Sequence, residues 1–173
     1  GESNSMGSLG FTEGVMTNAG TFRKSAGKLN VVSCLCTNTG TVEANVGRLS
    51  LRNYHQVGSA SQTILNGGEI GAEYQEFRLH IEGGTVRGNG NIKGHMDNTG
   101  GTVAPGFSAG TITIDGGNDF NHYIQGPGGT LDIEIGGATP GTGYDQLIVN
   151  GAAYLDGTLK IRFINGYSPP AGT

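Results

Sequence analysis

The chain has 173 residues, a net charge of −4 and 34 glycines but only five prolines, and its glycines follow no three-residue period, which excludes a collagen triple helix. A negative charge without a basic cluster argues against nucleic-acid binding, and no run of about 20 apolar residues is available for membrane insertion. Frequent glycine disfavours helix, whereas short runs of Thr, Val and Ile between glycines favour strands and tight turns.

The first feature in chain order is a repeated phrase. Residues 1–14 are predicted to be a polar lead or an expression remnant. After them, TNAGTFRKSAGKLNV and TNTGTVEANVGRLSL begin twenty residues apart and share their Thr-Asn start, glycines and apolar positions. DNTGGTV then places Asn98 sixty residues after Asn38, or three further steps of twenty. Such a period indicates stacked repeats, so we predict that Asn18, Asn38 and Asn98 form a side-chain ladder.

Two cysteines, Cys34 and Cys36, stand one residue apart in VVSCLC. Side chains at i and i+2 of a strand face the same way, so both thiols are predicted to face the core, with Leu35 outward. A metal site needs further ligands at suitable spacing, and a disulfide between the two would be strained. We interpret them as small buried hydrophobes; the sequence leaves their redox state and the compartment open.

Short segments of the form Gly-Thr-apolar-x-apolar recur along the chain, as in GTITI, GTLDIEI and GTLKIRF. Each alternates apolar and polar residues, which gives one buried and one solvated face. None is long enough to form a hydrophobic core by itself, so these strands must stack on similar strands of neighbouring coils. Glycine-rich corners connect them. The prediction is an all-β fold, a parallel β-helix (β-solenoid) with coils of about 20 residues.

The register of the repeat varies along the chain. It fades between residues 54 and 79, and the spacing lengthens and aromatic residues become more frequent after residue 103. We therefore predict solenoid coils over 15–103 and terminal coils, with an irregular cap, over 104–173 of the same domain.

The phrases GGTVAPGFSAGTITIDG and GGTLDIEIGGATPGTGYDQLIVNGAAYLDGTLKIRF resemble secreted surface proteins of Gram-negative and related environmental bacteria, which carry autotransporter-type or PEP-CTERM-anchored β-helical passengers. The resemblance covers roughly residues 15–173. It implies a right-handed parallel β-helix, an extracellular or cell-surface location, and roles in adhesion, matrix or fibre structure. In such proteins the ending PPAGT leads into one more apolar strand, which implies that the chain here either lacks that last strand or finds one in a neighbour.

Asp132 and Glu134 in GTLDIEI are the best candidates for a catalytic carboxylate pair. Aligning GTITI, GTLDIEI and GTLKIRF puts Thr113, Asp132 and Lys160 in one column and Asp115, Glu134 and Arg162 in the next. Opposite charges on neighbouring strands form ordinary solvated ion pairs, so the structural interpretation is favoured over the catalytic one. Alternation also predicts that both carboxylates face solvent, while the apolar residues between them face inward: Leu131, Ile133 and Ile135.

Two further kinds of site were weighed. Four aspartates in turn-like sequences could ligate Ca²⁺, but the nonapeptide of calcium-bound β-rolls is missing and turn formation explains them better: Asp97, Asp115, Asp119 and Asp145. Four tyrosines in the last third could form a sugar-stacking platform, although packing of the terminal coils is the simpler use: Tyr123, Tyr144, Tyr154 and Tyr167. No other cofactor is indicated.

The sequence thus predicts a non-catalytic structural or adhesive solenoid outside the cell. Its partners are expected at the solenoid ends and are either other copies of the chain or the remainder of a parent chain, with glycans as a further possibility. The alternatives are a carbohydrate-binding module that uses the tyrosine-rich third and a polysaccharide lyase or hydrolase of the β-helix type.

Overall fold

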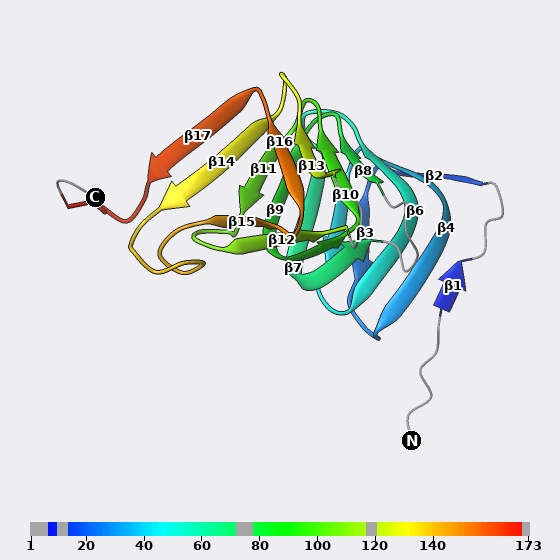
Figure 1. Cartoon of the computed structure of the whole chain (residues 1–173). Coiled ribbons are helices and arrows are strands. Elements are labelled where there is room, and N and C mark those ends of the chain that lie inside the picture. The colour runs from blue at the N-terminus through cyan, green and yellow to red at the C-terminus, as the bar shows by residue number, and fades with distance from the viewer. Residues whose placement is uncertain (1–6, 10–13, 72–77, 117–120, 171–173) are drawn as a thin grey trace.

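The computed structural model describes residues 7–9, 14–71, 78–116 and 121–170. Within these ranges it contains seventeen strands and no helix. Every pairing between named strands is parallel. Each strand lies beside an equivalent strand of the preceding coil, and the coils stack along one axis (Figure 1). The predicted all-β parallel β-solenoid is confirmed.

The described coils run repeatedly through three faces, named A, B and C here. Face A consists of β2 (Val15–Asn18), the second halves of β4 (Leu29–Asn38) and β6 (Arg48–Gln56), β8 (Arg78–Ile81), β10 (His95–Asn98), β13 (Asn121–Gln125) and β16 (Ala152–Leu155). Face B consists of β3 (Thr21–Lys24), β5 (Thr41–Ala44), the first halves of β7 (Gln62–Gly71) and β9 (Thr85–Lys93), β11 (Thr102–Pro105), β14 (Thr130–Ile135) and β17 (Thr158–Phe163). Face C consists of β1 (Gly7–Leu9), the first halves of β4 and β6, the second halves of β7 and β9, β12 (Thr111–Asp115) and β15 (Gln146–Val149).

The coils differ in length, although the repeat is real. Asn18 pairs with Asn38 after 20 residues. Asn98 lies in the same column three coils further on, as the sequence spacing suggests, but the steps are 18, 25 and 17 residues, through Gln56 and Ile81. Corners between faces absorb these differences, so the strands keep their register while the turns vary.

The repeated glycines lie where the backbone needs a positive φ or where two coils approach each other closely. Gly47 has a φ of 60°, in the left-handed region that favours glycine, and its counterpart Gly27 has a φ of 73°. At Gly40, an added Cβ would lie 2.2 Å from the carbonyl oxygen of Gly20 in the preceding coil. The glycines therefore recur because successive coils turn the same corner and approach each other closely there.

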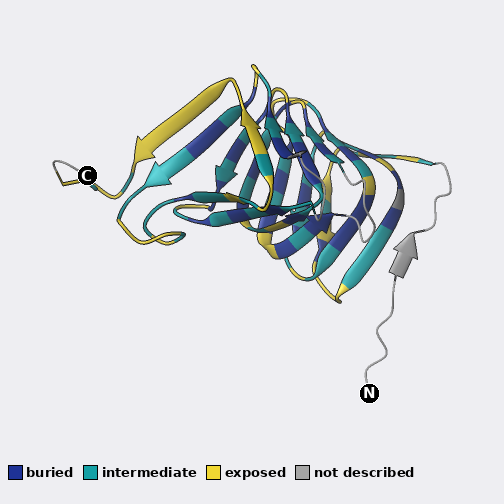
Figure 2. Cartoon of the chain, viewed as in Figure 1, coloured by how far each residue is buried: buried dark blue, intermediate teal, exposed yellow. Residues whose placement is uncertain are grey.

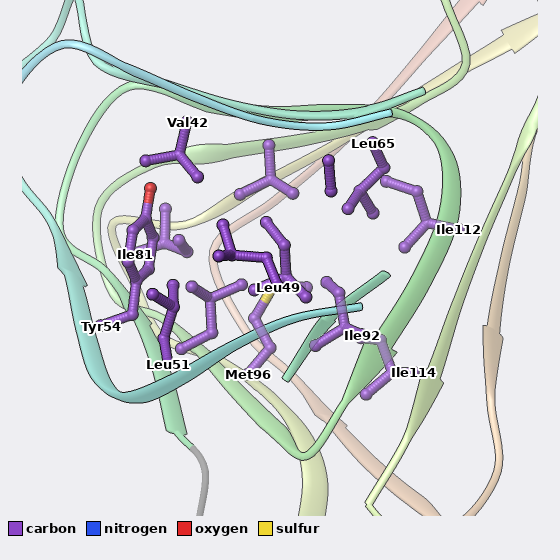
Figure 3. Close-up of a cluster of buried hydrophobic side chains, with 14 of the residues drawn as sticks. Val42, Leu49, Leu51, Tyr54, Leu65, Ile81, Ile92, Met96, Ile112 and Ile114 are labelled. Atoms are coloured by element: carbon purple, nitrogen blue, oxygen red, sulfur yellow. The ribbon is translucent and has the colours of Figure 1, made fainter. Parts of the chain in front are cut away.

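Apolar side chains from all three faces fill the space inside the coils (Figure 3). As predicted, Cys34 and Cys36 are buried in this core and Leu35 is exposed. Both cysteines are free thiols, and burial raises the pKa of Cys36 to about 12. The core side chains labelled in Figure 3 are Val42, Leu49, Leu51, Tyr54, Leu65, Ile81, Ile92, Met96, Ile112 and Ile114.

The structure corrects one part of the predicted alignment. GTITI belongs to β12 on face C, whereas GTLDIEI and GTLKIRF are β14 and β17 on face B. Thr113 therefore stacks between Asn91 and Ile148, and Asp115 stacks on Lys93, rather than on the residues of β14. The expected boundary between residues 103 and 104 falls inside β11, and the parallel ladder continues through it.

Candidate functional site: the open C-terminal coil

The last described coil, β15–β17, has neighbours on one side only. β15 pairs with β12, β16 with β13 and β17 with β14. Within the described ranges no strand lies on the other side of these three, so they form the C-terminal edge of the solenoid, where β17 and β16 lie outermost (Figure 1).

Inward-facing positions become exposed at this edge. In one column of face B, Val103 is 0% exposed, Leu131 is 8% exposed and Leu159 is 62% exposed. Ile161 and Phe163, the next alternate residues of β17, are also more than half exposed. Figure 2 shows β17 exposed along its length beside the mostly buried strands of the inner coils. Leu159 continues a core column, and Ile161 and Phe163 stack on the half-buried Ile133 and Ile135 of β14. No described coil covers these three side chains from the other side.

The apolar edge extends beyond β17. Leu155 on β16 continues the column of Gln125 and is exposed, and its neighbour Tyr154 is exposed too. Ile148 on β15 adds a partly exposed aliphatic side chain from face C. All three strands of the last coil therefore present apolar surface, and such a surface marks an interaction site.

The backbone of β17 offers unused hydrogen-bonding groups at the same edge. The N–H of Thr158 donates to the carbonyl of Gly129, and the N–H of Ile164 donates to that of Ile135. Because these directions alternate along a strand, N–H groups at even-numbered positions face β14. The N–H groups that face the open edge are those of Leu159, Ile161 and Phe163. An edge of this kind can pair with a further strand.

The outward side of β17 carries two cations that pair with the acids of β14. Lys160 Nζ lies 3.1 Å from Asp132 Oδ2, and Arg162 Nε lies 2.8 Å from Asp132 Oδ1. Arg162 also contacts Glu134 at 2.8 Å. The register confirms the predicted pairing of these strands, with Asp132 opposite Lys160 and Glu134 opposite Arg162.

The expected solvent exposure of Asp132 is wrong, because the residue is only 7% exposed. Lys160 and Arg162 are its partners at this buried position, so the charge is compensated. Burial alone would raise the pKa of Asp132, but the hydrogen bonds from Arg162 and Lys160 outweigh it and hold this pKa below its ordinary value. A compensated carboxylate of this kind serves to fasten β17 to β14.

The predicted asparagine ladder lies on face A, beside the corner that leads to face B. Asn18 Nδ2 donates to Asn38 Oδ1 at 2.8 Å. Asn38 is fully buried, and its own amide donates to the carbonyls of Gly40 and Gln62, while Oδ1 also accepts from the N–H of Gly40. Asn98 bonds Thr130 of the next coil in the same manner, at 3.4 Å. These amides tie successive coils together.

Sequence reasoning missed two glutamines that share this column. Gln56 Nε2 donates to the carbonyl of Gly83, and its Oε1 accepts from Thr63 Oγ1, which in turn contacts Tyr54 Oη. Gln125 accepts from a tyrosine two residues earlier and donates to the backbone of the following coil. The signal was present as a repeated Tyr-x-Gln, in YHQ and YIQ.

The structure does not bring the four predicted tyrosines to one surface. Tyr123 is fully buried in the core, where its hydroxyl donates to Gln125 at 2.8 Å, so it packs, as the favoured interpretation has it, and presents no ring face to a sugar. Tyr154 is exposed on β16. Tyr144, which bridges to Ile135, and Tyr167 are half-buried.

The candidate Ca²⁺ ligands make other contacts. Asp97 accepts two hydrogen bonds from Arg78 Nη1, both 3.1 Å, and Asp115 accepts from Lys93 Nζ at 2.5 Å. Asp145 accepts from the N–H groups of Gly110 and Glu134, both at 2.8 Å. Asp119 lies outside the described residues. No group of three or more acidic, histidine or cysteine side chains suited to a metal ion occurs in the described ranges.

The comparisons add no relative to this geometry. No family model, curated protein or solved structure matches the chain. In the part of the chain that the structure describes, no helix has the length and apolar character needed to cross a membrane.

Proposed function

We propose that the chain is a non-catalytic structural segment of an extracellular or cell-surface protein, in which the solenoid acts as a rod that is lengthened at its C-terminal coil. A further strand pairs with β17 and covers the apolar side chains that are exposed there. That strand belongs either to the remainder of a parent chain or to a second molecule.

The observation that carries this proposal is the column that ends at Leu159. Its members on β11 and β14 are buried by the coil that follows each of them, whereas Leu159 is 62% exposed. Covering an exposed leucine contributes about 1.5–3 kcal/mol, and pairing of a new strand would also use the free N–H groups of β17. The extracellular location rests on the resemblance to bacterial surface proteins and remains a prediction.

Strand addition can be tested by proline substitution on β17. Ile161→Pro removes an N–H that faces the open edge and leaves the hydrogen bonds to β14 in place, while Ile161→Val keeps that N–H. A fluorescent peptide with the sequence of residues 128–137, GGTLDIEIGG, reproduces the strand that already pairs with β17. We expect it to bind the wild type and Ile161→Val but not Ile161→Pro, as measured by fluorescence anisotropy.

Self-association of the wild type, measured by sedimentation over a concentration series, would also support strand addition if Ile161→Pro abolishes it. The proposal is wrong if the wild type binds no strand peptide and does not self-associate, or if Ile161→Pro behaves like the wild type.

A further inference from the structure

Ion pairs join neighbouring coils on the outside of the solenoid. Arg23 contacts Glu43 on face B, and Arg48 contacts Glu69 on face C. On face A, Arg78 lies 3.1 Å from Asp97. These pairs are cross-strand neighbours or near neighbours in the ladder, so each of these three cations meets an acid on the adjoining coil. Arg87 on face B differs, because it lies between Ile64 and Ala104 and stacks over Phe107 instead.

At the open edge, the outward charges of the last strand on face B are cations. Lys160 and Arg162 are the outward residues of β17, and their side chains remain 53% and 42% exposed even while they contact Asp132. A lysine ammonium has three donors and an arginine guanidinium has five, so both can accept another acidic partner from the open side. The strand that pairs there meets apolar residues inside and positive charge outside.

The N-terminal coil of a second copy does not fit these requirements. With Thr21 placed over Thr158, as in the existing ladder, Arg23 would lie over Lys160 and Lys24 over Ile161. A shift by two residues, the smallest that keeps the same face inward, would place Arg23 over Arg162 in one direction and over Thr158 in the other. The first two registers set like charges opposite each other, and all three put Lys24 against the apolar column of β17.

We propose that the strand bound by β17 alternates apolar and acidic residues over about six positions, and that it is not the N-terminal coil of a second copy. This inference rests on the proposed strand addition and specifies its partner. The acidic side chains lie over Lys160 and Arg162, and the apolar ones lie over Leu159 and Ile161.

Three labelled peptides test this partner chemistry: GGTLDIEIGG, its lysine form GGTLKIKIGG and its neutral form GGTLSISIGG. At low ionic strength we expect the acidic peptide to bind about five- to tenfold more tightly than the lysine peptide, with the neutral one between them, because opposite charges on paired strands attract and like charges repel. In about 1 M salt the three affinities should converge, because exposed charges are then screened.

A charge-reversed protein, Lys160→Glu with Arg162→Glu, should invert the order of the peptides. Because that change also removes the partners of Asp132, the salt series on the wild type serves as an independent measurement. Equal binding of the three peptides, a preference for lysine, or self-association that Ile161→Pro abolishes would overturn the inference and leave strand addition intact. No binding of any peptide together with no self-association would overturn both.

Discussion

The inner coils and the last coil are built from the same pattern and differ in their environment. β11 and β17 both begin with Thr followed by an aliphatic residue, and both lie on face B. Val103 is fully buried and Leu159 is mostly exposed, although they occupy one column. In a solenoid, the next coil therefore buries the apolar side chains of the one before it. Similar strands contribute differently to stability according to their position in the stack.

The largest expected difference separates two leucine-to-alanine substitutions on face B. Leu65→Ala removes a fully buried side chain in a middle coil and should lower the free energy of unfolding by about 2–5 kcal/mol. Leu159→Ala removes an exposed side chain and should cost less than about 1 kcal/mol. Urea unfolding followed by circular dichroism measures both. Equal losses would mean that the last coil is covered in the free protein.

A second comparison concerns the amide ladder. Asn38→Ala removes three hydrogen bonds made by a fully buried side chain and should cost about 1–3 kcal/mol. Asn18→Ala, in the half-buried coil before it, should cost less, because water can replace its bonds and Asn38 Oδ1 keeps the N–H of Gly40. If both variants lost equal stability under urea, the ladder would not depend on burial.

A smaller effect should appear as a pH dependence of the last two coils. Hydrogen bonds from Arg162 and Lys160 outweigh burial and depress the pKa of Asp132 below 3.8, whereas burial raises the pKa of Asp145 above 3.8. The stabilising contribution of Asp132 is thus present above pH 3.8 and is lost as the pH falls through its native pKa. Asp145 contributes most below pH 3.8 and loses that contribution as the pH rises through its native pKa.

Carboxyl ¹³C titration by NMR gives the two native pKa values directly. Urea unfolding of Asp132→Asn and Asp145→Asn should show stability differences from the wild type that change with pH in opposite directions. Two carboxyl groups that titrate together at the ordinary value would contradict this expectation.

The smallest effect is expected at the surface of the first coils. Arg23 contacts Glu43 with its own side chain more than half exposed, and solvent and salt screen such a pair. Arg23→Ala should therefore leave the urea midpoint unchanged within error, at low and at high salt. A clear shift would show that the N-terminal coil is held by electrostatics more strongly than the inner coils are.

Much of this architecture follows from local pattern. The alternation in TLDIEI and TLKIRF, the glycines at positions such as Gly47, and the twenty-residue step from Asn18 to Asn38 each depend on residues close in the chain or on exact repetition. Strand periodicity and left-handed glycine corners are properties of short segments, which is why the solenoid class and the first ladder step could be read directly.

The face on which a strand lies could not be read in this way. GTITI looks like GTLDIEI, yet the two lie on different faces, because corner segments of varying length decide where each strand rejoins the stack. The burial of Tyr123 and of Asp132 likewise depends on strands about thirty residues away along the chain. A residue-by-residue pattern carries no information on these neighbours.

The sequence by itself determined that short parallel strands would stack, which side of each strand is apolar, and which glycines must turn the corners, because these follow from alternation and backbone freedom. Only the tertiary structure decided which columns are closed by a following coil and which, at Leu159 and Ile161, remain open. The physical reason is that the apolar side chains of one coil are buried by the next coil. A strand of a given pattern is therefore part of the core inside the stack and an exposed binding surface at its end.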